Sequence, residues 1–188
     1  WRNFDAASGA LQFAEKHEWI PTLGVSYFVA VDGLGLLMLL LTAVVTPMAM
    51  LASWKLAGTS STSSQTSSRK DGDAMERVPT GHGAHLFFAL ILFLQAGLFG
   101  TFTALNFFHW FIFWELSLIP AFFLVRLWGG LNRAPAATQF FVYTMVGSVA
   151  MLLAFLAIFL ATGKMDFIEL AEMGRNGTLA GALSAILG

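Results

Sequence analysis

The feature that most constrains this chain is the distribution of its charged residues. No Asp, Glu, Lys or Arg occurs within residues 33–54, 78–114 or 134–163. A membrane helix needs roughly 20 mostly apolar residues to cross about 30 Å of hydrocarbon, and each stretch is long enough for at least one crossing. The sequence therefore predicts an all-α fold, a polytopic bundle of transmembrane helices.

The composition agrees with a membrane protein and excludes several functions. The 188 residues are 57% hydrophobic and 11% charged, whereas soluble domains are about 45–50% apolar and about 25% charged. The net charge of −1 argues against a nucleic-acid partner, which requires a basic face. The chain has no cysteine, so it offers no thiolate for zinc or iron–sulfur clusters. We expect no cofactor and no metal in this chain.

Four complete spans are predicted. The charge-free stretch before Glu115 is too long for one helix, and the polar break at Asn106 divides it into two spans that form a tight hairpin. The predicted spans cover residues 31–54, 85–106, 107–128 and 140–161.

The segments outside the spans are polar or mixed. Residues 1–30 combine apolar and charged side chains, which suggests an amphipathic segment at the periplasmic interface. Residues 55–84 form a Ser-rich loop whose composition cannot bury enough apolar surface to become ordered. Residues 129–139 are a second loop, and residues 162–188 a loop followed by the start of a further helix. We expect the chain to be a piece of a longer membrane protein.

The positive-inside rule orients the four spans. The side of the two loops carries six of the ten Lys and Arg residues and the other side carries four, which favours the loop side as cytoplasmic. Trp54 and Trp128 end their helices on that side, where amphipathic indoles are favoured. We therefore predict a multi-pass protein of the cell inner membrane. The six are Lys55, Arg69, Lys70, Arg77, Arg126 and Arg133, and the four are Arg2, Lys16, Lys164 and Arg175.

Glu115 is the candidate catalytic residue, because it lies inside the third predicted span. Eight residues after Phe107, it is about 12 Å deep at about 1.5 Å per residue. A carboxylate at that depth costs at least about 2.5–3.5 kcal/mol, so such residues face a bundle interior or water and are functional candidates. A carboxyl there can take up and release a proton when its partner moves. The alternative is a structural glutamate in a permanent ion pair.

Pro120 is a second candidate, because its ring prevents a backbone hydrogen bond to the carbonyl of Leu116, next to Glu115. That carbonyl needs water or a polar neighbour, so a hydrated kink beside the carboxyl is one interpretation and a packing kink is the other. Arg126 lies on the same helical face three turns away, and is expected to snorkel to the headgroups or to end a polar track.

The other polar residues have simpler explanations. We interpret His109 as an interface residue and Asp32 as a helix N-cap, with a proton entry as the alternative for Asp32. Lys164 flanks the fourth span. His82 and His85 could suggest a pair of metal ligands, but the sequence shows no third ligand near them. Small residues on one stripe of the fourth span predict close packing against other helices; they are Gly147, Ala150, Ala154, Ala157 and Ala161.

Three stretches resemble one known family. They are LNFFHWFIFWELSLIPAFFLVRLWGG (residues 105–130), VDGLGLLMLLLTAVVTPMAMLASWK (31–55) and AATQFFVYTMVGSVAMLLAF (136–155). They are similar to the proton-translocating membrane subunit of respiratory NADH-quinone oxidoreductase (complex I) known as chain M or chain 4. Gln139 stands where that family is expected to have lysine, and the Ser-rich loop is longer.

The resemblance implies a subunit of about fourteen helices, of which this chain supplies the third to sixth, with other complex I membrane subunits as partners. It also implies that Glu115 pairs with a lysine on the next helix, beyond this chain, to move a proton, while other subunits carry the redox chemistry. Two alternatives remain open, the large subunit of a multisubunit cation/proton antiporter and a structural membrane anchor.

Overall fold

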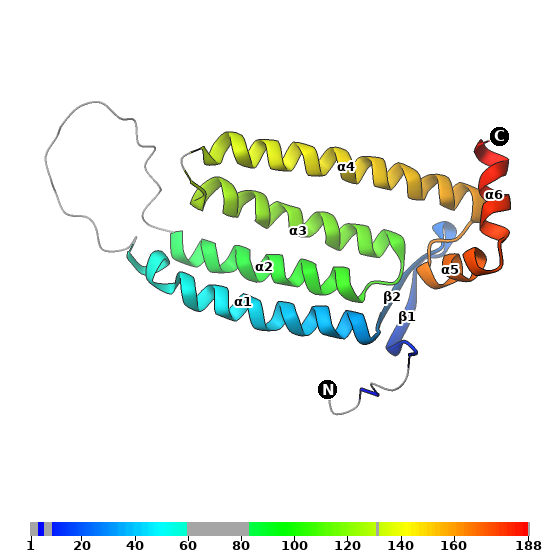
Figure 1. Ribbon diagram of the computed structural model, residues 1–188, viewed down its shortest axis with the longest axis horizontal. Helices are drawn as coiled ribbons and strands as arrows, with labels where there is room; N and C mark the ends of the chain where they lie inside the picture. Colours follow the sequence, from blue (N-terminus) through cyan, green and yellow to red (C-terminus); the bar gives the residue numbers. More distant parts are fainter. Residues whose placement is uncertain (1–3, 6–8, 60–82, 131, 188) are drawn as a thin grey trace, which may run out of the picture.

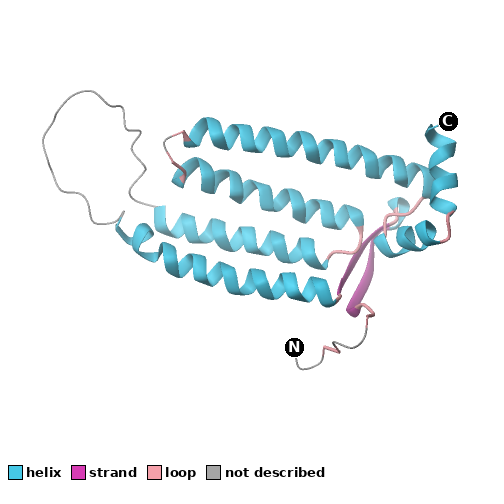
Figure 2. Ribbon diagram, in the orientation of Figure 1, coloured by secondary structure: helices cyan, strands magenta, loops and turns pink. Residues whose placement is uncertain are grey.

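The computed structural model describes residues 4–5, 9–59, 83–130 and 132–187. Its main elements are α1 (Gly33–Thr59), α2 (Gly83–Thr103), α3 (Phe107–Trp128) and α4 (Arg133–Thr162). Figures 1 and 2 show these helices side by side, each antiparallel to the next. All four are long and apolar enough to cross a membrane. The predicted transmembrane bundle with four spans is confirmed.

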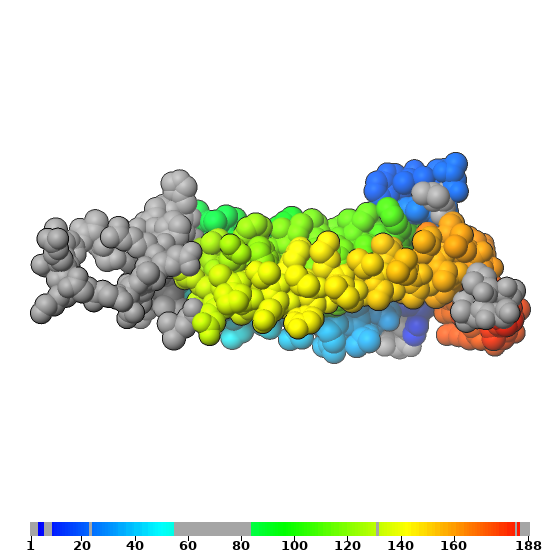
Figure 3. Space-filling model, turned by 90° about the horizontal axis from the view of Figure 1, so that it is seen from above, coloured from blue at the N-terminus to red at the C-terminus, as the bar shows by residue number. Residues whose placement is uncertain are grey.

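The helices form an open row, because each packs mainly against its neighbour in the chain. At most 17% of the most apolar 18-residue window of each helix is buried. Leu51 and Leu160 are both 72% exposed, and the space-filling view shows α4 lying uncovered along the molecule (Figure 3). These apolar faces can contact lipid or further helices, because an α-helix satisfies its own backbone hydrogen bonds.

The observed ends of some helices differ by several residues from the ends of the predicted spans. α3 covers the residues predicted for the third span, and α2 ends three residues before the predicted 106. α4 begins at Arg133 instead of 140, and it can include Pro135 because a missing N–H costs nothing in the first turn of a helix. The predicted Ser-rich loop falls mostly on residues 60–82, outside the described part of the chain.

Residues 12–31 form a β-hairpin where an amphipathic interfacial segment was predicted. β1 (Gln12–Ile20) pairs antiparallel with β2 (Val25–Val31), and the 3-10 turn η1 (Pro21–Leu23) joins them. The run VSYFVAV is rich in β-branched and aromatic residues, which favour strands. Gly24 follows the turn at a φ of 64°, a conformation that glycine adopts without strain.

The hairpin is attached to one end of the row of helices (Figure 1). We call this region the hairpin end; it consists of β1, β2, residues 104–106 and α5 (Phe167–Arg175). Leu105 donates its backbone N–H to Phe28 at 2.8 Å. On the other side, Phe107 N–H reaches the Met165 carbonyl, and Phe167 N–H reaches the Leu105 carbonyl, both at 2.9 Å. The short α2–α3 connection is thus held between β2 and the chain that follows α4.

The two ends of the row differ in composition. At the hairpin end, Asp32 Oδ1 accepts the Gly35 N–H at 2.6 Å, which confirms the predicted N-cap of α1. At the opposite end, Trp54 packs on Phe88 and Trp128 on Phe87, with ring centroids 5.7 and 5.1 Å apart. The chain continues past α5 into α6 (Thr178–Leu187).

Candidate functional site

Glu115 lies near the middle of α3 and is partly buried. Its Oε1 is buried and has no hydrogen-bond partner among the described residues. The start of α3 is fixed by Asn106, whose side chain accepts the Phe108 N–H at 3.2 Å. An unpaired polar atom away from water costs roughly 1–3 kcal/mol or more. This carboxyl oxygen therefore requires a partner from water or from a further helix.

One face of α3 packs closely against α2. A Cβ placed on Gly97 would lie 2.9 Å from the Ser117 Cβ, and one placed on Gly100 would overlap the Phe113 ring. Only glycine permits this approach, as is common where membrane helices pack closely. The α2–α3 interface is therefore tight, and Ser117 and Phe113 define the α2 side of α3.

The other face of α3 packs against α4 through aromatic pairs. Phe107 stacks on Phe155 with ring centroids 3.7 Å apart, and Phe122 meets Phe141 at 5.2 Å. Glu115 lies between Phe107 and Phe122 in sequence and within about 80° of both around the helix at 100° per residue. It therefore belongs to the side of α3 that faces α4.

Pro120 is less than 2% exposed inside α3. It lies about 140° around the helix from Glu115 at 100° per residue, so its ring and the carboxyl point in different directions. Its effect on Glu115 must act through the backbone, at the carbonyl of Leu116 that a proline ring leaves without its helical donor. The helix nonetheless continues through Pro120 to Trp128.

Arg126 and Glu115 do not meet. Arg126 is exposed, and its guanidinium lies over the Phe122 ring, 5.8 Å from the centroid. This position agrees with the snorkelling interpretation, because the charged group stays at the helix end while the stem covers apolar surface.

His109 lies beneath the hairpin and is only 7% exposed. Its ring contacts Tyr27 and Phe113 at centroid distances of 4.8 and 5.0 Å, and its Nδ1 has no hydrogen-bond partner among the described residues. The contacts are those of a packed aromatic ring. His85 is exposed, and His82 lies outside the described residues. In the described part of the chain, no three His, Asp or Glu side chains gather as metal ligands would.

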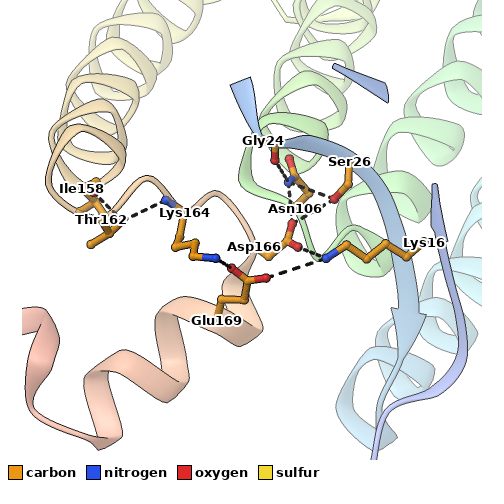
Figure 4. A network of polar contacts seen from close by, with 9 residues as sticks. All are labelled: Lys16, Gly24, Ser26, Asn106, Ile158, Thr162, Lys164, Asp166 and Glu169. Atoms are coloured by element: carbon orange, nitrogen blue, oxygen red, sulfur yellow. Dashed lines mark hydrogen bonds and ion pairs between the residues drawn. The ribbon is translucent and has the colours of Figure 1, made fainter. Parts of the chain in front are cut away.

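A buried polar network at the hairpin end was missed by the sequence analysis (Figure 4). Asp166 is 5% exposed, and its carboxylate accepts from three side chains. Lys16 Nζ lies 2.5 Å from Oδ2, while Asn106 Nδ2 and Ser26 Oγ lie 2.7 and 3.1 Å from Oδ1. The four residues come from four separate segments, so no local motif could have revealed the cluster.

The network continues towards solvent through Glu169. Its carboxylate pairs with Lys164 Nζ at 2.8 Å and lies 4.0 Å from Lys16 Nζ. The hydrogen bond to Asp166 raises the pKa of Lys16 above its usual 10.5, with the charges of Asp166, Glu169 and Glu18 adding to it and partial burial opposing it. A cavity of about 210 Å³ borders these groups. Lys164 thus has an ion-pair partner beyond its predicted role as a flank.

Comparison with known proteins finds similarity to subunits of oxidoreductases. Residues 104–188 match the family described as NADH:quinone oxidoreductase/Mrp antiporter, transmembrane. The chain is 42% identical over 157 residues to F(420)H(2) dehydrogenase subunit M of Methanosarcina mazei, an alignment covering 84% of this chain and 27% of that protein.

Cyanobacterial relatives give a similar result. NAD(P)H-quinone oxidoreductase chain 4-3 of a Nostoc species is 34% identical over 181 residues, covering 96% of this chain and 28% of that protein. Chain 4 2 of Thermosynechococcus vestitus is 33% identical over 189 residues, covering 100% of this chain and 31% of that protein. The chain spans less than a third of the length of these curated relatives.

Proposed function

We propose that this chain, which through residues 104–188 belongs to the NADH:quinone oxidoreductase/Mrp antiporter family, is part of the proton-translocating membrane subunit of a respiratory quinone oxidoreductase complex. The observation that carries the proposal is the buried carboxyl oxygen of Glu115, in the middle of an apolar helix, for which the described part of the chain offers no hydrogen-bond partner. Ionisable residues at such depth are rare in membrane helices and mark ion pathways.

Glu115 acts in this proposal as a proton carrier. Its carboxylate oxygen takes a proton from one side of the membrane, becomes neutral, and releases the proton towards the other side when the charge near it changes. The resemblance places that changing charge on a lysine of the membrane span that follows α4, beyond this chain. The open face of α4 supports the presence of further helices beside this row. Electron transfer takes place in other subunits and drives the charge movement.

The proposed setting is the cell inner membrane, with the hairpin end on the periplasmic side. The exposed apolar faces of α1 and α4 then contact lipid or the remaining helices and neighbouring subunits. The named relatives are subunits of F(420)H(2) dehydrogenase and NAD(P)H-quinone oxidoreductase, which supports partners of that kind.

A second candidate is the large subunit of a multisubunit cation/proton antiporter, since the family description covers both kinds of protein. Both use a carboxyl inside the membrane. They differ in the driving force, which is electron transfer in one case and an opposing cation gradient in the other. A membrane anchor without an ion pathway is the third interpretation.

The test is Glu115→Gln in the full-length protein, assembled with its partner subunits in sealed vesicles. Proton uptake and quinone reduction are measured together after addition of the electron donor. We expect quinone reduction to continue and proton pumping to fall markedly, because the amide cannot carry the proton. Glu172→Gln, the same change at an exposed position of α5, is the matched control and should pump normally.

Three outcomes separate the candidates. Loss of donor-driven pumping supports the respiratory complex. Cation/proton exchange without any electron donor, lost in Glu115→Gln, favours the antiporter. Normal proton transport in Glu115→Gln by both assays would support the anchor interpretation and reject proton transfer through this carboxyl.

A further inference from the structure

Ser148 of α4 is a buried hydroxyl with no evident structural use. It is 4% exposed, and its Oγ has no hydrogen-bond partner among the described residues. Hydroxyls inside helices commonly donate to the carbonyl four residues earlier, and Thr144 and Thr162 of the same helix do so at 2.7 and 2.8 Å. Ser148 does not, so its hydroxyl remains free to bond across the helix interface.

Ser148 lies at the same level of the membrane as Glu115. The ring pairs Phe107–Phe155 and Phe122–Phe141 fix the register of the antiparallel helices α3 and α4. Measured from the first pair, Glu115 lies eight residues along α3 and Ser148 seven residues along α4, which is about 12 Å and about 10.5 Å at 1.5 Å per residue. Measured from the second pair, each lies seven residues away.

Both side chains also belong to the facing sides of their helices. Phe141, Ser148 and Phe155 are spaced by seven residues, so they lie within about 40° of one another at 100° per residue. The burial of Ser148 agrees with this, because its neighbours Gly147 and Val149 are exposed. The α3–α4 interface thus contains two buried polar oxygens, Glu115 Oε1 and Ser148 Oγ, at a level between the two aromatic pairs.

We infer that Glu115 and Ser148 together form a water site between α3 and α4, in which Ser148 is a positioning residue for proton transfer at Glu115. Two unpaired oxygens in hydrocarbon are costly, and one water can satisfy both, accepting from the Ser148 hydroxyl and donating to the Glu115 carboxylate. In the transfer step, this water gives a proton to Oε1 and regains one from the next water of the path. This inference rests on the proposed function of Glu115.

The experiment compares four variants of the full-length protein in its assembled complex, one of which is Glu115→Gln. Ser148→Ala removes the hydroxyl with little change in volume, and Ser148→Thr keeps a hydroxyl at this position. Ser117→Ala is the matched control, because Ser117 lies on the α2 side of α3 and donates to the Trp114 carbonyl at 2.7 Å. Proton pumping and quinone reduction are measured in vesicles, and the carboxyl C=O stretch is followed by infrared difference spectroscopy. The band that disappears in Glu115→Gln is assigned to Glu115.

We expect Ser148→Ala to lose most of the pumping that Glu115→Gln loses, while quinone reduction continues. The Glu115 band should move to higher frequency, since a carboxyl with weaker hydrogen bonding has a stiffer C=O bond. Ser148→Thr should keep native proton pumping and the native frequency of the Glu115 band, and Ser117→Ala should change neither of them. If Ser148→Ala does not assemble, Ser148→Cys, which keeps the volume and has a weaker donor, carries the same expectation.

Two results would overturn the inference, and they are distinguishable. Normal pumping and an unmoved band in Ser148→Ala, alongside lost pumping in Glu115→Gln, reject the role of Ser148 and leave the proposed function intact. Normal pumping in Glu115→Gln itself rejects the proposed function, and the role of Ser148 with it.

Discussion

Lys16 Nζ and Asp166 Oδ2 lie 2.5 Å apart, although 150 residues separate them in the sequence. The contact joins β1 to the segment that follows α4, and Asn106 at the start of α3 binds the other oxygen of the same carboxylate. Asp166 therefore connects the hairpin, the α2–α3 connection and α5 at one point (Figure 4). We interpret this cluster as the group that fixes the hairpin to the helices.

Replacing Asp166 with alanine should loosen the hairpin end. The change removes acceptors from Lys16, Asn106 and Ser26 at a site that is 5% exposed. A hydrogen bond to a charged group typically contributes about 1.5–3 kcal/mol to stability. Because the Lys16 side chain is 46% exposed and regains water, we expect the total loss of stability to lie near the lower end of this range. The apparent unfolding temperature in detergent and the proteolysis rate of residues 12–31 measure the effect. Glu15→Gln, on the exposed part of β1, should change neither.

The Lys16 ion pair should also give the hairpin end a pH dependence. The pKa of Lys16 is raised in the folded protein above 10.5, first by its hydrogen bond to Asp166, so folding favours the protonated form. Its stabilising contribution is therefore complete below pH 10.5 and is lost as the pH rises through the higher folded value. The difference in unfolding temperature between the native protein and Lys16→Met should be constant at lower pH and shrink above 10.5. A difference that grows with pH would contradict this assignment.

Gly97→Ala should weaken the α2–α3 interface. The added Cβ would lie 2.9 Å from the Ser117 Cβ and 3.1 Å from its Cα, and the backbone of α3 cannot move aside as a flexible side chain would. Overpacking of this kind costs about 1–3 kcal/mol, which a lower apparent unfolding temperature in detergent would reveal. Gly33→Ala, where nothing lies within 4 Å of the added Cβ, is the control. Equal stability of the two variants would show that α2 and α3 separate easily.

Pro120→Ala should reduce proton pumping without preventing assembly. The N–H of alanine donates to the carbonyl of Leu116, so the backbone acceptor adjacent to Glu115 is no longer free to bind water. Alanine is also about 3 kcal/mol better than proline inside a helix, so α3 should not unfold. Pumping and quinone reduction in vesicles are compared with Pro47→Ala, the same change inside α1. If both variants pump like the native protein, Pro120 only shapes packing.

Several features could be predicted from the sequence because they depend on neighbouring residues. The four membrane helices follow from charge-free stretches of sufficient length, since transfer of an apolar stretch into hydrocarbon depends on its own composition. The Asp32 cap could be predicted for the same reason, because a cap bonds a backbone N–H only three residues away. The isolated position of Glu115 in its helix was likewise visible in the sequence.

The hairpin was less accessible to sequence reasoning, although its signals are local. Residues 12–20 mix charged and apolar side chains in a way that also fits an amphipathic surface segment, and β1 is largely exposed. What stabilises the strand form is pairing with β2 and the backbone bond from Leu105 to Phe28. An isolated two-stranded hairpin is only marginally stable, so the attachment to the helix ends decides this structure.

The sequence by itself determined that this chain lies in a membrane, how many times it crosses, and which carboxyl is placed there at a cost. Only the tertiary structure decided that this carboxyl lies on the side of α3 that packs against α4, and which residues hold the helix ends together. The antiparallel packing of α3 and α4 places Ser148 at about the same height along the helices as Glu115. The folded-back hairpin brings Lys16 into contact with Asp166. Hydrophobic transfer is a sum over neighbouring residues, whereas these pairings depend on packing between segments that the sequence order keeps apart.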